Sequence, residues 1–137
     1  MMIVLNEDLI PIFKEPDVIL FRNRLKEYAT KIGMGLVNQT KLITAASELT
    51  RNMLKYAGGG NALIQVVNEG PQNGIRVIFE DEGPGIADIH QAMQDGFSTG
   101  KSLGLGLPGA KRLVSDFDIE SELGKGTVVK ILKWKNG

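Results

Sequence analysis

The strand-forming runs of this sequence come in adjacent pairs that are separated only by short connections. One pair covers residues 62–68 and 75–80 around a five-residue connection at 70–74, and another covers 117–122 and 127–134. Such connections predict β-hairpins, because parallel strands need long crossovers. A doubly wound parallel fold would need alternating crossovers, which are missing. We therefore expect an α+β protein, a two-layer sandwich with helices on one face of a mostly antiparallel sheet.

Two amphipathic helices are predicted ahead of the first hairpin. Apolar residues recur every three or four positions over residues 16–32 and 38–56, and Asn38 is the expected N-cap of the second helix. A third helix is predicted with Pro108 in its first turn, and a short helix over 88–94. The first fourteen residues read as one or two strands.

Composition narrows the possible functions. The chain has 137 residues, which suits one domain over residues 1–137. Its 16 basic and 16 acidic residues cancel, so charge gives no support for a nucleic-acid or membrane partner. The absence of cysteine and the single histidine, His90, argue against disulfide, thiolate and His-based zinc chemistry. No signal peptide and no apolar run of about 20 residues is visible, so we expect a cytoplasmic protein.

A carboxylate followed by two glycines ends the second strand of the first hairpin. Asp81, Gly83 and Gly85 stand at alternate positions directly after the apolar run 75–79. A carboxylate at this place can accept a hydrogen bond from the exocyclic amine of a purine, and glycines let the backbone approach a ligand closely. Alone, the pattern fits an ordinary turn after a strand equally well.

The second predicted helix carries a carboxylate and an amide on one face. Glu48 and Asn52 are four residues apart, which places them about 40° apart around the helix axis, at the border of the apolar stripe. An amide oxygen suits Mg²⁺, and a carboxylate can take the proton of an attacking hydroxyl, so the pair suits phosphoryl transfer. An ordinary solvated polar pair would have the same spacing.

The segment between the two hairpins is rich in glycine. Residues 96–106 have no hydrophobic period and lead into the third helix, so a mobile loop is expected there. Free backbone N–H groups at a helix start favour phosphate oxygens. The spacing is neither that of a P-loop nor that of the dinucleotide fingerprint. The candidate phosphate ligands in this segment are Ser98, Thr99, Lys101, Gly104 and Gly106.

Together and in this order, these pieces resemble the GHKL ATPase/kinase superfamily, which includes gyrase, Hsp90, MutL and the histidine-kinase catalytic domain. The resemblance covers about residues 38–134 and implies the Bergerat sandwich as the fold. The N, G1, G2 and G3 boxes are matched by Glu48-x3-Asn52, Asp81-x-Gly83-x-Gly85, Gly104-x-Gly106 and Gly126-Thr127. Four longer runs are similar to the small bacterial serine/threonine kinases of the RsbT type: Ser47–Asn52, Glu80–Ile86, Asp95–Thr99 and Gly106–Leu113.

The resemblance implies ATP and Mg²⁺ as cofactors. At the adenine end, it implies that Asp81 binds the amino group of the base. Gly83 and Gly85 would let the loop pass close to the nucleotide. Thr127, which alone reads as the start of a strand after a hairpin turn, would support the adenine side through a water shared with Asp81.

At the phosphate end, the resemblance implies that Asn52 ligates Mg²⁺ and that Glu48 is the catalytic base toward the substrate hydroxyl. Residues 96–106 would form the lid over the triphosphate. Lys55 stands where related boxes often have a basic residue near the phosphates, although a solvated lysine would occupy the same position.

The resemblance also implies a reaction and partners. A kinase of this type transfers the γ-phosphoryl group of ATP to serine or threonine on a STAS-domain protein that sequesters it. Once released, the kinase activates a downstream effector, such as a phosphatase. The expected setting is a stressosome-type partner switch.

Other members of the superfamily provide alternatives. An anti-sigma factor that holds a sigma subunit and uses ATP to change partners would share the boxes, although residues 95–99 and 106–113 favour the kinase. In a histidine-kinase catalytic domain, the N box usually begins with Asn in place of Glu48. A chaperone or topoisomerase ATPase would need further domains, for which we expect no room in this chain.

Overall fold

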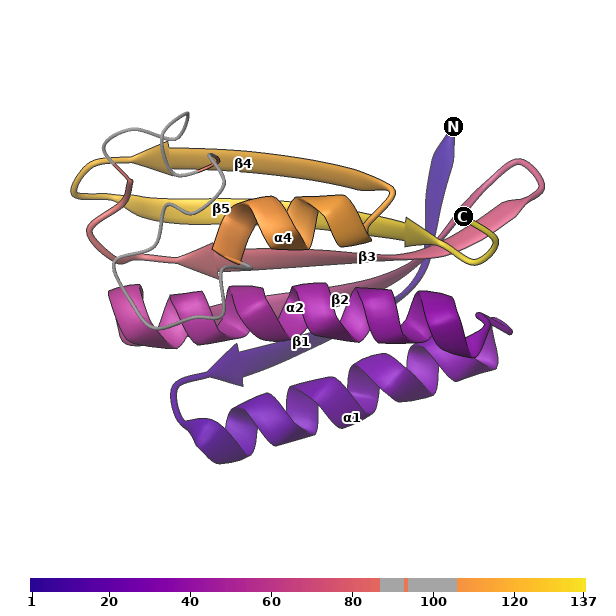
Figure 1. Ribbon diagram of the computed structural model, residues 1–137, viewed down its shortest axis with the longest axis horizontal. Helices are drawn as coiled ribbons and strands as arrows, with labels where there is room; N and C mark the ends of the chain where they lie inside the picture. Colours follow the sequence, from indigo (N-terminus) through magenta and orange to yellow (C-terminus); the bar gives the residue numbers. More distant parts are fainter. Residues whose placement is uncertain (87–92, 94–105) are drawn as a thin grey trace.

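The computed structural model describes residues 1–86, 93 and 106–137 of the chain. Five strands and three helices are found in this part of the chain (Figure 1). The helices are α1 (Glu15–Lys31), α2 (Leu36–Ala57) and α4 (Gly106–Leu113). The strands are β1 (Met2–Ile12), β2 (Gly60–Glu69), β3 (Gln72–Asp81), β4 (Asp116–Glu122) and β5 (Gly126–Trp134).

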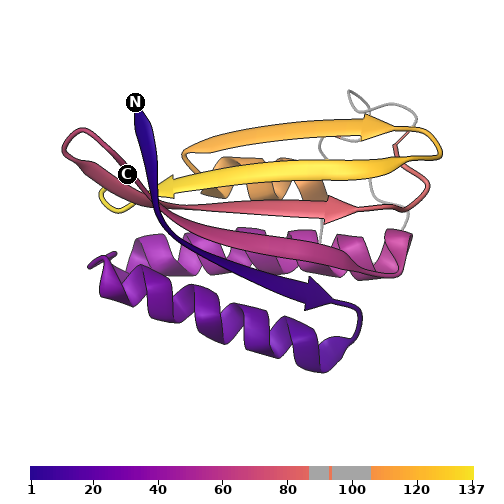
Figure 2. The ribbon, with the colours of Figure 1, turned by 180° about the vertical axis from the view of Figure 1, so that it is seen from behind.

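The strands form one sheet in the order β1-β2-β3-β5-β4, and every neighbouring pair is antiparallel. All three described helices lie on one face of this sheet (Figure 1), and the view from behind shows the other face without a helix (Figure 2). The predicted α+β two-layer sandwich is therefore confirmed. The end of β3 and the C-terminal end of α2 lie at the same end of the molecule, opposite the two termini.

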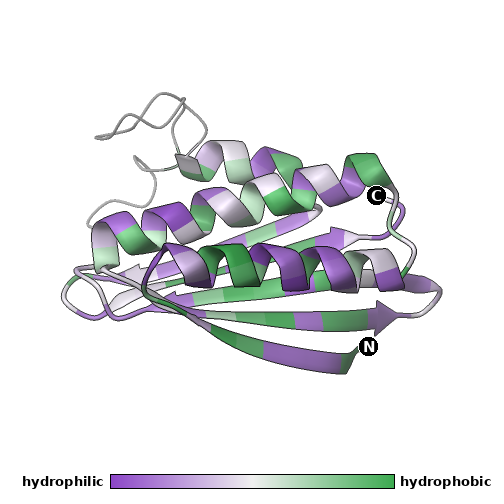
Figure 3. Ribbon diagram, turned by 90° about the horizontal axis from the view of Figure 1, so that it is seen from below, coloured by the Kyte–Doolittle hydropathy of each residue, from purple (hydrophilic) through white to green (hydrophobic). Residues whose placement is uncertain are grey.

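The core lies between the helices and the sheet. Both long helices alternate hydrophilic and hydrophobic residues along their length (Figure 3), as amphipathic helices do. From α1, Phe21 and Leu25 are fully buried, and the Phe21 ring meets that of Phe79 edge to face at a centroid distance of 5.8 Å.

Within the described residues, no helix has both the length and the apolar character that crossing a membrane requires.

Helix α2 begins earlier than the sequence predicts. Its N-cap is Gly35, so the prediction of Asn38 as the N-cap is wrong. The Asn38 side chain instead donates a hydrogen bond of 3.2 Å to the carbonyl of Lys135, which follows β5. The helix ends where predicted, at Gly58, which has a left-handed conformation with φ of 74°.

The first hairpin is tighter than predicted. Strand β2 continues to Glu69 and β3 starts at Gln72, so the turn has two residues instead of five. The amide of Asn68 donates to the carbonyls of Gly70 and Gln72 and to the side chain of Asn73, and so ties the end of β2 to the turn and to the start of β3.

The remaining elements follow the predictions closely. The first residues form one strand, β1, with a register shift between Val4 and Asn6. Helix α4 begins at Gly106, so Pro108 lies in its first turn, as predicted. The helix expected over 88–94 and the loop expected over 96–106 lie outside the described residues, apart from single positions.

Candidate active site

Asp81 is fixed at the end of β3 through one of its two carboxylate oxygens. It pairs in register with Thr127, the second residue of β5. Its Oδ1 accepts hydrogen bonds from the backbone N–H of Gly83, at 2.9 Å, and of Thr127, at 3.3 Å. Its Oδ2 has no hydrogen-bond partner among the residues described. The side chain is half-buried and presents one free acceptor of the kind that an exocyclic amine requires.

The glycines around Asp81 leave no room for side chains. A Cβ on Gly83 would lie 2.5 Å from the Cβ of Ala57, at the end of α2. Gly85 has φ of 77°, and a Cβ there would collide with the carbonyl of Glu122. Gly126 has φ of 122°, and its Cβ would collide with the carbonyl of Asp81 itself. These positions therefore require glycine, and backbone forms the surface beside the carboxylate.

Ser121, which no sequence pattern singles out, connects the two loops of the site. Its Oγ accepts the N–H of Ile86 at 2.7 Å, donates to the carbonyl of Gly126 at 3.1 Å and lies 2.8 Å from Oγ1 of Thr127. Ser121 and Thr127 are paired directly across β4 and β5. The register of this hairpin was the signal that could have revealed Ser121.

Glu48 is buried on α2, deeper than the rim position predicted for it. The residue is 5 % exposed. Its Oε1 accepts a hydrogen bond from Nη1 of Arg51 at 2.6 Å, and the two form an ion pair. Its Oε2 is buried and has no hydrogen-bond partner in the described part of the chain. Buried polar atoms are normally paired, so this oxygen calls for an explanation.

The helix that carries Glu48 and Asn52 extends to the Asp81 end of the sheet. Met53 approaches Gly60, where a Cβ would lie 2.7 Å from the methionine sulfur and 3.1 Å from the Cβ of Asp81. Asn52 precedes Met53 and is half-buried. The structure thus brings the second half of α2 and the carboxylate–glycine loop together.

For the other predicted site residues, the structure gives a position only for Lys55 and Gly106. Lys55 is exposed, and its Nζ lies 5.3 Å from the centroid of the neighbouring Tyr56 ring. Gly106 is the first residue of α4, which packs beside α2. Ser98, Thr99, Lys101 and Gly104 lie outside the described residues. The phosphate-binding roles of all these residues stay predictions.

The polar atoms of the site are of the kinds that a nucleotide with a bound Mg²⁺ requires. Over the residues that the structure describes, no group of three or more His, Cys, Asp or Glu side chains could hold a metal by itself. An ion held jointly by the Asn52 amide oxygen and phosphate oxygens needs no such group, because Mg²⁺ usually keeps waters and substrate phosphates as ligands.

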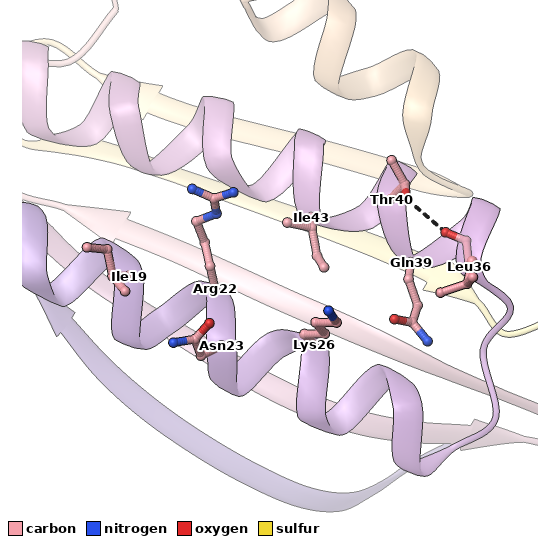
Figure 4. Close-up of a pocket in the computed structure, with 8 residues that line it drawn as sticks. All are labelled: Ile19, Arg22, Asn23, Lys26, Leu36, Gln39, Thr40 and Ile43. Atoms are coloured by element: carbon pink, nitrogen blue, oxygen red, sulfur yellow. Dashed lines mark hydrogen bonds between the residues drawn. The ribbon is translucent and has the colours of Figure 1, made fainter.

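A separate surface pocket lies between α1 and α2, away from these residues (Figure 4). Its volume is about 430 Å³. Two cations from α1, Arg22 and Lys26, contribute to its walls, and at its other end Thr40 donates a hydrogen bond to the carbonyl of Leu36. None of the predicted site residues that the structure describes lines it. The described residues that line it are Ile19, Arg22, Asn23, Lys26, Leu36, Gln39, Thr40 and Ile43.

Comparison with known proteins defines the class. Residues 37–136 match the family model described as histidine kinase-, DNA gyrase B-, and HSP90-like ATPase. The chain belongs to this family of ATPases, and the predicted resemblance to the GHKL superfamily is confirmed.

Among individual relatives, the chain is 42% identical to the serine/threonine-protein kinase RsbT of Bacillus subtilis (strain 168) over 129 residues, which are 94% of this chain and 97% of that protein. The predicted resemblance to the RsbT type is thereby confirmed. It is 28% identical to an anti-sigma F factor of Thermoanaerobacter sp. (strain X514) over 118 residues, 82% of each chain. The anti-sigma relatives are thus more distant.

A solved structure supports the fold. The RsbU and RsbW domains of Rv1364c from Mycobacterium tuberculosis match with a TM-score of 0.66 at 18% sequence identity. The match covers 93% of this chain and 32% of that longer one. At this identity, the likeness concerns the fold alone.

Proposed function

We propose that this protein is an ATP-dependent serine/threonine protein kinase. The observation that carries the proposal is the buried Glu48 carboxylate, whose Oε2 lacks a partner in the described structure, on a helix that extends to the Asp81 loop. An acceptor oxygen held in this way is suited to take the proton of a substrate hydroxyl. The 42% identity to a serine/threonine-protein kinase supports the same reaction.

Nucleotide selection would be the task of the Asp81 loop. Oδ2 of Asp81 would accept a hydrogen bond from the amino group of adenine. Oδ1 would keep its hydrogen bonds from the backbone N–H groups of Gly83 and Thr127. Gly85 and Gly126 keep the surface beside the base free of side chains. Thr127 completes the adenine side, through the water that the family resemblance implies.

Phosphoryl transfer would take place beside α2. The serine or threonine oxygen of the substrate forms a bond to the γ-phosphorus, the bond from that phosphorus to the ADP oxygen breaks, and Glu48 takes the hydroxyl proton. A Mg²⁺ ion, when bound with ATP, would neutralise charge on the phosphates, and Asn52 would hold it. Lys55 and the lid residues Ser98, Thr99, Lys101, Gly104 and Gly106 would contact the phosphates.

The substrate that we propose is a serine or threonine of a STAS-domain protein in a cytoplasmic partner switch. The unphosphorylated STAS protein would hold the kinase, and phosphorylation would release it to activate an effector such as a phosphatase. These partners rest on the similarity to RsbT and on the family resemblance. The alternative function is that of an anti-sigma factor, and the lower identity of 28% to the anti-sigma F factor disfavours it.

Incubation with [γ-³²P]ATP and the STAS-domain proteins of the same organism tests the proposal. We expect label on one of these proteins, at a serine or threonine that phosphopeptide mapping identifies. A pull-down that offers STAS proteins and sigma subunits in parallel separates the two alternatives. ATP binding together with sigma capture, and no label on any STAS protein, would favour the anti-sigma factor instead.

A further inference from the structure

We propose that Arg51 is a positioning residue that holds the Glu48 carboxylate ready for proton transfer. This inference rests on the proposed function of Glu48 as the catalytic base. Arg51 Nη1 donates to Oε1 of Glu48 across 2.6 Å, the length of a strong charge-assisted hydrogen bond. The two residues are three apart on α2, so the helix itself sets their separation.

The burial of the two side chains is strongly unequal. The Glu48 side chain is 6 % exposed, whereas the Arg51 side chain is 63 % exposed. A surface pair at this spacing normally has two solvated ends and contributes little. Here the acidic end lies in the protein interior, where an ionised carboxylate needs a compensating charge or hydrogen bonds. Arg51 is the one ionic partner that the described structure provides for it.

The pairing also leaves the two oxygens of Glu48 in different states. Oε1 is held by the guanidinium, while Oε2 is buried and has no partner in the described structure. A carboxylate bound through one oxygen cannot rotate freely, so the direction of the other oxygen is fixed. The oxygen left open is then the one available to a substrate hydroxyl. Arg51 would thus act on the reaction through Glu48, without touching ATP or the substrate.

The side-chain chemistry makes the substitution of Arg51 informative. A guanidinium is planar and permanently charged and orients its N–H groups in a fixed fork, whereas an ammonium is a point charge on a flexible stem. Arg51→Lys should therefore keep the charge with poorer orientation. Arg51→Gln removes the charge at a mostly exposed position but keeps an N–H donor for the Glu48 carboxylate, so we expect it to fold.

A double-mutant cycle tests the role. Transfer rates and ATP dissociation constants are measured for the wild type, Glu48→Gln, Arg51→Gln and Glu48→Gln/Arg51→Gln, each with the full chain. General bases contribute about 10²–10⁴-fold, so we expect Arg51→Gln to lower kcat at least about tenfold, with the KM and Kd for ATP within about twofold. Arg51→Lys should recover part of this loss. The double variant should be no slower than Glu48→Gln alone, because Arg51 acts only through Glu48.

Lys41→Gln is the matched control, because Lys41 is also an exposed cation on α2. It should leave the transfer rate unchanged. Wild-type kcat in Arg51→Gln, a loss of ATP affinity that matches the loss of rate, or additive effects in the double variant would each overturn the positioning role. A wild-type protein that transfers no phosphoryl group would instead overturn the proposed function, and the role of Arg51 with it.

Discussion

The backbone N–H of Thr127 donates to Oδ1 of Asp81 at 3.3 Å and so joins the start of β5 to the end of β3. The same oxygen accepts the N–H of Gly83. One carboxylate oxygen therefore has a structural task and the other has no partner among the described residues. This division separates the folding role of Asp81 from its proposed role in base recognition, and a substitution can test them independently.

Asp81→Asn should keep the loop folded but weaken ATP binding. The amide oxygen of Asn can still accept the N–H groups of Gly83 and Thr127, whereas its amino group cannot accept the adenine amine. Hydrogen bonds to a charged group contribute about 1.5–3 kcal/mol, so we expect the Kd for ATP to rise about 10–100-fold. Isothermal titration calorimetry measures this change. Unchanged ATP affinity in a folded variant would contradict the adenine role.

Gly126→Ala should damage both stability and ATP binding. Its φ of 122° strains any other residue, and the added Cβ would displace the Asp81 carbonyl. Gly70→Ala is the control, because Gly70 also has a positive φ, 61°, but has open space around its Cβ position. We expect the control to lose about 1–2 kcal/mol of folding free energy with an unchanged Kd. Urea unfolding and ATP titration of both variants distinguish strain alone from strain that moves Asp81.

Ser121→Ala should loosen the connection between the two loops beside Asp81. It removes the hydrogen bonds to Ile86 and Gly126 and the contact with Thr127, at a cost of about 1 kcal/mol or more. ATP affinity should fall as well, because the loop becomes less ordered before binding. In Ser115→Ala, which loses the hydrogen bond from the Trp134 N–H at the other end of β4, only stability should fall. Equal ATP affinities in the two variants would argue against a role for Ser121 in the site.

Lys41→Gln should stabilise the protein in a pH-dependent way. Burial, and then repulsion from Lys41, lowers the pKa of Lys133. Between this lowered pKa and the ordinary lysine pKa, the unfolded chain binds more protons, so the contribution of Lys133 to stability increases as pH rises through this window. Below the window, Lys133 is charged and repelled by Lys41. Removing Lys41 should then raise Tm by about 1 °C at pH 7.

The same substitution should lose most of its effect near pH 11, above the ordinary lysine pKa, where Lys133 is mostly neutral in both states. Lys130→Gln, which removes an exposed charge from β5, serves as the reference. Thermal unfolding at both pH values measures the difference. An equal gain at pH 7 and near pH 11 would mean that repulsion of Lys133 is not the cause.

Periodicity was sufficient to predict the layers of the fold, because hairpin connections and amphipathic stripes are local properties. Periodicity failed where side-chain contacts outside the periodic pattern determine the ends of an element. The start of α2 was misplaced because Asn38 bonds to Lys135, a residue that comes after β5. The hairpin turn was predicted too long because the strand pairing continues to Glu69 and Gln72, next to the Asn68 side chain, which bonds to Gly70, Gln72 and Asn73.

The candidate site, too, could be predicted only in part from the sequence. Asp81, Gly83 and Gly85 were identified because they stand close together in the sequence. Ser121 was missed because its partner Ile86 is 35 residues away, and the connection exists only once β4 and β5 are in register. Spacing placed Glu48 at the rim of the core, but the folded protein leaves this residue only 5 % exposed.

Glu48→Gln tests the central proposal most directly. The amide has the same shape as the carboxylate but cannot take a proton from a substrate hydroxyl. Single-turnover transfer from [γ-³²P]ATP to the STAS substrate, measured beside ATP binding, separates chemistry from affinity. We predict an ATP Kd within about twofold of the wild type and a transfer rate lower by about 10²–10⁴-fold. Transfer at the wild-type rate would contradict the assignment of Glu48 as the base.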